Sequence, residues 1–299
     1  MKKKSVGFLL ADIVYIDMMI LPVLCGIVIS VLTSPASDGI EITGALIYFS
    51  IPMPLQDLLI GESQINSWLI MISITGLCLY LTHGLKSRIE LKRQYFAEWI
   101  VEALDKLVKS NMGEYFAGFA PFIGAIIALS AFSSLMALFG LYAPTSDLNV
   151  VAGWAIVSFV LISYYKLKCG PWYYVKGLAS PILLTPLNVI GEVATPVSMA
   201  FRHYGNVLSG AVISVLVAAG LQGLSGIVLG WLPGFLGEFP FLQIGIPAVL
   251  SIYFDVFSGC LQAYIFAMLT MMYVADGFPM EDYFKRKNKK TKKLNQEVI

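Results

Sequence analysis

The chain has 299 residues, of which 58% are hydrophobic and 13% are charged, and its mean hydropathy is +0.77. This composition excludes an ordinary soluble domain and indicates a polytopic helical membrane protein. The net charge of +1 says little, but the placement of the charges is informative. Lys2–Lys4 open the chain and a dense basic run closes it, so both ends are expected to be cytoplasmic by the positive-inside rule.

The closing run consists of Lys285, Arg286, Lys287, Lys289, Lys290, Lys292 and Lys293. We interpret it as a solvated tail near anionic lipid rather than as a nucleic-acid contact, which is the alternative for such a run. The four cysteines are far apart and the only histidines are His83 and His203, which argues against a zinc site. Phosphate-binding loops and serine-elbow motifs are absent from the sequence. We therefore predict no metal, no cofactor and no catalytic residue.

The first 33 residues contain an apolar run from Met18 to Val31. A cleaved signal peptide and a retained spanning helix are the two interpretations. Asp12 and Asp17 are unusual for a signal peptide, so a retained helix is favoured. Residues 34–63 then lie outside the cytoplasm, as an irregular segment with several short β-prone pieces.

Four elements are predicted in the next part of the chain. Residues 65–80 are predicted to form a helix that crosses the membrane toward the cytoplasm. Residues 90–109 have apolar positions at helical spacing with charges between them, which predicts an amphipathic helix on the cytoplasmic membrane face or against a partner. Residues 115–142 and 150–165 are two spans of a helical hairpin. Its turn is PTSDLN (144–149), in which Ser146 or Asp147 is suited to cap the second helix.

Two further helices are predicted at 177–232 and 237–277, each longer than a bilayer requires. Helices of this length must tilt strongly, bend, or lie partly along the membrane plane. Pro181, Pro186 and Pro196 would bend the first, and the segment from Gly230 to Pro240 separates the two. The fold class is therefore all-α, with about five to six helices.

Arg202 is the only lysine or arginine between Lys176 and Lys285. An arginine at the centre of a membrane helix costs roughly 2.5–3.5 kcal/mol on insertion scales, which marks such a residue as a functional candidate. The alternative is a snorkelling or salt-bridged residue that fixes helix packing, with Asp255 as its fixed partner. His203 points about 100° away from Arg202 on a helix, so we expect it to line a packing surface.

Two polar tracks run inside the last two helices. One shares the helix face of Arg202 and comprises Thr195, Ser198, Asn206 and Ser209, with Gly205 and Gly210 small enough for close helix approach. The other comprises Asp255, Ser258 and Gln262, whose spacing predicts one polar stripe. Glu192 is rotated from the face of Arg202. The tracks indicate a buried ion pair or a hydrated ion path, although Asn206 and Gln262 could also be interhelical hydrogen-bonding residues.

The segments FRHYGNVLSG (201–210), PLNVIGEVATPVSMAFRHYGN (186–206), PTSDLN (144–149) and GCLQAYIFAMLTMMYVADG (259–277) resemble subunit a of F-type ATP synthases, over about residues 60–277. The resemblance implies a non-catalytic stator whose long tilted helices pack against a rotor ring. It also implies two offset half-channels for H⁺ or Na⁺ with Arg202 between them. The two ions remain open alternatives, because selectivity depends largely on the ring.

On this resemblance the ion-translocation residues are Arg202, Asn206, Gln262, Asp255, Glu192, Ser198 and Ser258. The implied partners are the c-subunit ring, the peripheral-stalk b subunits, the rest of the complex and the lipid of the bacterial plasma membrane, and no nucleic acid. We expect an N-terminal extra helix and external segment at 1–63, the subunit a-like domain at 64–277 and a cytoplasmic tail at 278–299. Ala211 replaces a glutamate that some members carry, and His203 and Tyr204 replace a usual Leu-Phe.

Two other functions stay open at this point. A secondary transporter could bind an anionic substrate at an intramembrane Arg202 and Asp255 site, although it would predict internal repeats, which are not visible in the sequence. A non-conducting assembly subunit is the third interpretation, but it would need no arginine in the middle of the membrane.

Overall fold

The protein was analysed as a computed structural model, which describes residues 6–33, 44–54, 57–86, 92–179, 181–229, 241–280 and 283–284. Within those ranges, six helices are long and apolar enough to cross a membrane, which confirms the all-α polytopic class. They are Val6–Thr33, Glu62–Thr82, Glu114–Phe139, Leu148–Lys168, Thr185–Val228 and Gly245–Gly277. The predicted basic tail from Lys285 onward lies outside the described residues.

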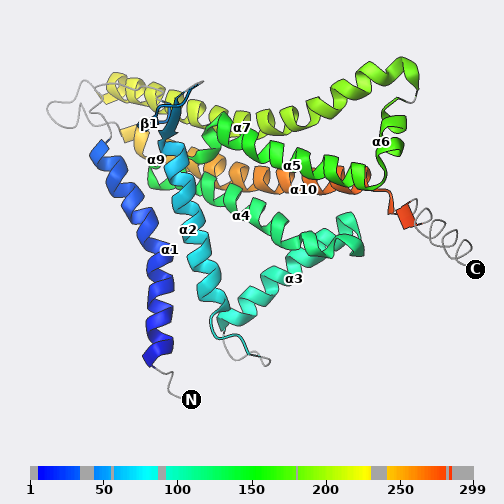
Figure 1. Ribbon diagram of the computed structural model, residues 1–299. Helices are drawn as coiled ribbons and strands as arrows, with labels where there is room; N and C mark the ends of the chain where they lie inside the picture. Colours follow the sequence, from blue (N-terminus) through cyan, green and yellow to red (C-terminus); the bar gives the residue numbers. More distant parts are fainter. Residues whose placement is uncertain are drawn as a thin grey trace, which may run out of the picture.

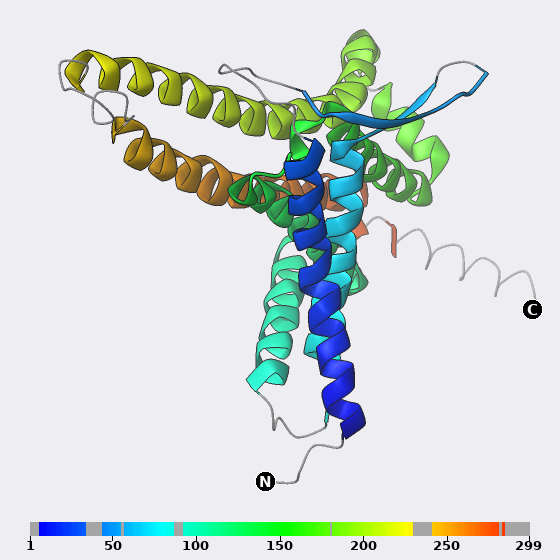
Figure 2. The same ribbon diagram turned by 90° about the vertical axis from the view of Figure 1, so that its left-hand side faces the viewer.

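The first helix, α1 (Val6–Thr33), packs along α2 (Glu62–Thr82), and the two run side by side in both views (Figures 1 and 2). Their backbones approach closely at Gly76, where an added Cβ would lie 2.8 Å from the Met19 amide nitrogen. Only a glycine permits this contact, because any side chain would separate the helices. The predicted helix within the first 33 residues is therefore present and has a specific neighbour.

The segment between these helices contains a hairpin of β1 (Ile47–Ile51) and β2 (Leu58–Gly61), which pair antiparallel. The prediction of an irregular segment was wrong for these residues, and the β-prone pieces form the two strands. Pro52 and Pro54 fall in the connection, where a proline removes no ladder hydrogen bond.

The amphipathic helix α3 (Lys92–Met112) confirms the periodic pattern, while the expected start at Glu90 lies outside the described residues. Val108 and Met112 are buried against α4 and α10, whereas aromatic residues near its beginning, Tyr95, Phe96 and Trp99, are exposed. One end of α3 is thus part of the core and the other presents an apolar surface.

The predicted hairpin is present as α4 (Ala120–Met136) and α5 (Leu148–Lys168), with short 3₁₀ turns at Glu114–Phe119, Ala137–Phe139 and Pro144–Ser146. Asp147 caps α5, because its Oδ1 accepts a hydrogen bond from the Asn149 amide at 2.9 Å. The capping role predicted for Ser146 or Asp147 therefore belongs to Asp147.

The C-terminal part differs from the prediction at its start. Instead of one helix from Gly177, the chain forms α6 (Pro171–Leu178), a 3₁₀ turn (Ile182–Leu184) and then the long α7 (Thr185–Leu229). A helix tolerates proline in its first turn, which fits Pro186 directly after Thr185. The predicted break at Gly230–Pro240 lies outside the described residues.

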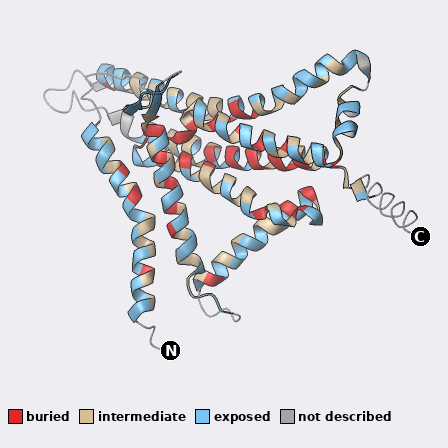
Figure 3. Cartoon of the chain, viewed as in Figure 1, coloured by how far each residue is buried: buried red, intermediate tan, exposed pale blue. Residues whose placement is uncertain are grey.

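The last span consists of α9 (Phe241–Ser251), a π-helical turn (Ile252–Ser258) and α10 (Gly259–Gly277). In Figure 2, α7 and the α9–α10 span extend across the direction of α1 and α2, as expected for two strongly tilted helices. Burial is concentrated along α10 (Figure 3), which packs against both α4 and α5. Gly259 permits this packing because an added Cβ would collide with Ser134.

Candidate ion-translocation site

Arg202 lies near the middle of α7 and is exposed on the surface of the chain. Met199, Ala200 and His203 are buried and form the inward face of the helix at this level. Arg202 is therefore turned outward. It makes no ion pair or hydrogen bond with any other described residue, so the structure does not support Asp255 as its fixed partner.

His203 confirms the expectation of a packing role. Its side chain is fully buried, with the ring in edge contact with Trp154 and Phe266 at centroid distances of 6.0 and 5.7 Å. Its Nε2 lies 3.2 Å from Ser130 Oγ on α4. The residue thus fixes α7 against α4, α5 and α10, which positions the outward face that carries Arg202.

Asn206 contacts the last span one turn beyond Arg202. Its Nδ2 donates to Ser258 Oγ at 2.8 Å, and the Ser258 hydroxyl lies 3.0 Å from Asn206 Oδ1. Close contact is possible because Gly210, a turn further, meets Phe254, where an added Cβ would lie 3.0 Å from the Phe254 Cβ. Gly205 has no neighbour within 4 Å among the described residues, so close approach is confirmed for Gly210 and stays a prediction for Gly205.

The predicted stripe of Asp255, Ser258 and Gln262 is divided by the π-helical turn. A π turn changes the angle between successive side chains, so α-helical spacing does not hold across it. Ser258 meets Asn206, while Gln262 is buried in α10, with 5% of its surface exposed. Asp255 is half-buried and faces a separate cavity.

That cavity has a volume of about 280 Å³ and extends from Asp255 to the turn between α4 and α5. Its polar lining includes Tyr142 and Ser146, and α7 contributes Val207 and Ala211. Tyr142 Oη donates a hydrogen bond to the Ser146 carbonyl at 3.2 Å. Burial, with a smaller effect of the Asp147 carboxylate, raises the pKa of the Tyr142 phenol, so the group is neutral near pH 7.

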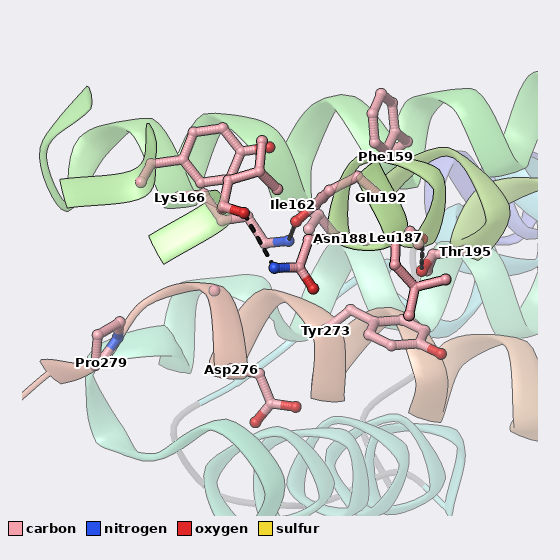
Figure 4. A pocket seen from close by; sticks show the side chains of 14 residues that line it. Phe159, Ile162, Lys166, Leu187, Asn188, Glu192, Thr195, Tyr273, Asp276 and Pro279 are labelled. Atoms are coloured by element: carbon pink, nitrogen blue, oxygen red, sulfur yellow. Dashed lines mark hydrogen bonds and ion pairs between the residues drawn. The ribbon is translucent and has the colours of Figure 1, made fainter. Parts of the chain in front are cut away.

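A second cavity, of about 700 Å³, lies at the other end of α5 and α10 (Figure 4). Lys166 Nζ on α5 and Glu192 Oε1 on α7 form an ion pair of 2.6 Å in its wall. Asn188 Nδ2 donates to the Leu178 carbonyl at 3.0 Å, which ties α7 to α6. Glu192 is thus held by a cation, an arrangement that the sequence did not predict.

The two cavities contact α7 on opposite sides of Arg202. Thr195 lines the cavity of Glu192, and Val207 lines the cavity of Asp255. The helix between these residues is about 18 Å long at 1.5 Å per residue. Arg202 lies between the cavities, and Ser198 is exposed on the same stretch without lining either one.

Sequence reasoning missed Lys166, Tyr142 and Ser146 as cavity residues. Lys166 had a visible signal, because it is a lysine at the inner end of a span, but its partner could not be read from the sequence. No group of three or more potential metal ligands occurs in the ranges that the structure covers.

Six candidate spans, with an outward-facing arginine on α7 between two cavities, are the features of a multi-pass membrane protein. Residues 64–275 match the family described as ATP synthase A chain, and the protein belongs to this family. It is a multi-pass, non-catalytic membrane subunit of a bacterial ATP synthase, and it forms the ion channel of the stator.

Three relatives illustrate the similarity. The subunit a from Propionigenium modestum, described as sodium ion specific, is 28% identical over 239 residues, covering 73% of this chain and 74% of its own. Subunit a from Desulforamulus reducens is 32% identical over 218 residues, covering 72% and 78%. Subunit a 1 from Crocosphaera subtropica is 29% identical over 226 residues, covering 74% and 89%. Membership in this family decides against the transporter and the non-conducting assembly subunit.

Proposed function

We propose that Arg202 separates two half-channels that reach a rotor ring from opposite sides of the membrane. The observation that carries this proposal is its position between the two cavities on α7, directed outward. Arg202 lines neither cavity and the two linings share no residue, so an ion that passes from one to the other would do so outside the chain. A rotating ring of c subunits with a mid-membrane carboxylate would carry the ion along this external route.

The electrostatics of an arginine suit this step. A ring carboxylate that turns into lipid must be neutral, because a bare charge in hydrocarbon is too costly. Beside Arg202 the ionised form is stabilised, so the carboxylate releases its ion there. Arginine is always charged, and the site therefore cannot lose its function by deprotonation.

The remaining site residues divide between the two paths. Asp255 is the acid of the cavity that opens toward the α4–α5 turn, and Glu192 is the acid that α7 contributes to the other. Asn206 and Ser258 hold the two long helices together beside Arg202. Ser198, on the exposed face, would contact the ring, and Gln262 would support the path from within the helix packing.

The orientation follows from the positive-inside rule. Lys166 and Lys168 end α5, so this end and the cavity of Glu192 would be cytoplasmic, as would the C-terminus. The cavity of Asp255 would then be external. The membrane is the bacterial plasma membrane, and the further partners are the b subunits of the peripheral stalk. Residues 1–63 would form a retained extra helix with an external hairpin, residues 64–277 the channel domain and residues 278–299 a cytoplasmic tail.

The test is Arg202→Ala in the purified complex, reconstituted into vesicles. ATP-driven ion pumping should fall at least about 100-fold, which corresponds to roughly 2.7 kcal/mol of lost stabilisation. His203 is adjacent but faces inward, so His203→Gln, with intact assembly, serves as the control and should retain pumping. Pumping by the Arg202→Ala complex at the level of the control would refute the proposed separator.

A further inference from the structure

Lys166 is held in the wall of the larger cavity by three neighbours. Its ammonium is 2.6 Å from Glu192 Oε1 and 5.8 Å from the centroid of the Tyr174 ring. The aliphatic part of the Lys166 side chain packs against Gly277, where an added Cβ would be 2.8 Å from Lys166 Cγ. Gly277 ends α10, and a helix C-terminus favours a nearby cation. The ammonium is therefore a fixed charge of this cavity.

The Lys166 ammonium is paired with the Glu192 carboxylate, which α7 contributes to the cavity wall. Lys166 and Glu192 are only 22% and 21% exposed in their side chains, so solvent screens the pair incompletely. The other acid of the lining, Asp276, lies on α10, apart from the pair in Figure 4. A metal cation that approached Glu192 would have to displace or adjoin the ammonium.

A sodium ion meets two obstacles at this position. It requires oxygen ligands in place of its water, and one of the two Glu192 oxygens, Oε1, already accepts a hydrogen bond from the ammonium. It would also be repelled by the ammonium, by roughly 4 kcal/mol at 4 Å for an effective dielectric constant of about 20. A proton avoids both obstacles, because each group along a hydrogen-bonded path can pass one proton on and receive another. No second cation then has to reside beside Lys166.

We propose that Lys166 is a specificity-determining residue that keeps metal cations from Glu192 and makes this half-channel a proton path. Lys166 acts as a tethered cation in the position that Na⁺ would otherwise take. The inference rests on the proposed function, because it assumes that ions pass through this cavity to the ring.

The experiment uses the whole complex in vesicles, with ATP-driven H⁺ pumping as the readout. Na⁺ replaces choline at the ATPase-exposed face, on the order of 0.1 M at constant ionic strength, so that general screening stays fixed. The variants are Lys166→Gln, Lys166→Met and the double variant Lys166→Gln/Glu192→Gln. Lys168→Gln is the matched control, since Lys168 ends the same helix but contacts the rings of Tyr115, Tyr164 and Tyr165 and does not line the cavity.

We expect wild type and Lys168→Gln to pump equally well in Na⁺ and choline. In Lys166→Gln, Na⁺ binds the freed carboxylate and lowers pumping, by about twofold when its concentration equals the dissociation constant. The double variant lacks the Glu192 carboxylate, so its pumping is again insensitive to Na⁺. Lys166→Met should show the same Na⁺ inhibition as Lys166→Gln, and it is the variant to measure if the Lys166→Gln complex fails to assemble.

Three results would overturn the inference: wild-type turnover that requires Na⁺, equal Na⁺ effects in the Lys166 and Lys168 variants, or Na⁺ inhibition that persists in the double variant. Each is read in complexes that still pump. Failure of the proposed function would instead appear as pumping without Arg202. The two failures are therefore distinguishable.

Discussion

Removal of the Asp12 carboxylate should weaken the attachment of α1 to the rest of the protein. Asp12 Oδ1 accepts a hydrogen bond of 2.6 Å from Arg93 Nη1 and lies 2.9 Å from His83 Nδ1. Arg93 Nη2 also donates to the His83 carbonyl at 2.6 Å. The side chains of Arg93 and Asp12 are only 10% and 12% exposed. One carboxylate thus joins α1 to the end of α2 and the start of α3.

The magnitude follows from the charge that remains. Asp12→Ala leaves the Arg93 guanidinium buried without its carboxylate, and breaking a buried pair in this way costs about 3–5 kcal/mol. For a chain of this size the apparent melting temperature should fall by roughly 6–20 °C. Asp12→Ala combined with Arg93→Met should recover most of this loss, because no uncompensated charge is left.

The assay is heating of the detergent-solubilised protein, fused to a fluorescent protein, followed by size-exclusion chromatography. The control is Glu102→Ala on α3, which breaks a pair of similar length, 2.8 Å to Lys106, in which the side chains of Lys106 and Glu102 are 74% and 66% exposed. No measurable shift is expected there, because solvent screens exposed pairs. Equal shifts for Asp12→Ala and Glu102→Ala would refute the reasoning.

Two further predictions concern the contact between α7 and the last span. Gly210→Val should lower pumping and reduce the free energy of unfolding by about 1–3 kcal/mol, because the valine side chain would overlap Phe254. Gly205→Val should leave the stability of the chain unchanged, because Gly205 has no neighbour within 4 Å among the described residues, and equal losses of stability at both positions would contradict this. Asn206→Leu should slow pumping about 3- to 30-fold, if the whole pair energy of roughly 0.6–2 kcal/mol is lost in the rate-limiting step. Ser258→Ala should slow pumping by a similar factor, and the double variant Asn206→Leu/Ser258→Ala should pump no more slowly than either single variant. Additive losses would show that the two residues act independently.

The spans and the arginine could be predicted from the sequence because both are local signals. A run of apolar residues long enough for the bilayer identifies a span, and an isolated cation inside such a run is conspicuous at once. The cap at Asp147 is local in the same sense. His203 was correctly assigned to the packing face, because its direction relative to Arg202 follows from helix geometry alone.

Other features depended on packing or on a change of helix type. Lys166 and Glu192 are 26 residues apart on different helices, so no spacing rule could pair them. The predicted stripe from Asp255 to Gln262 assumed α-helical geometry, and the π turn at Ile252–Ser258 invalidated it. A π turn has no sequence signature comparable to a proline or a cap.

The contrast between the cations of this chain bears on why Arg202 faces outward. Arg93 and Lys166 have carboxylates of the chain at 2.6 Å and serve fixed contacts. An equally tight internal partner for Arg202, worth about 3 kcal/mol, would have to be released whenever a ring carboxylate took its place. That release would slow each step about 100-fold. An arginine that exchanges partners at every step is therefore best left without one in its own chain, as the described residues leave it.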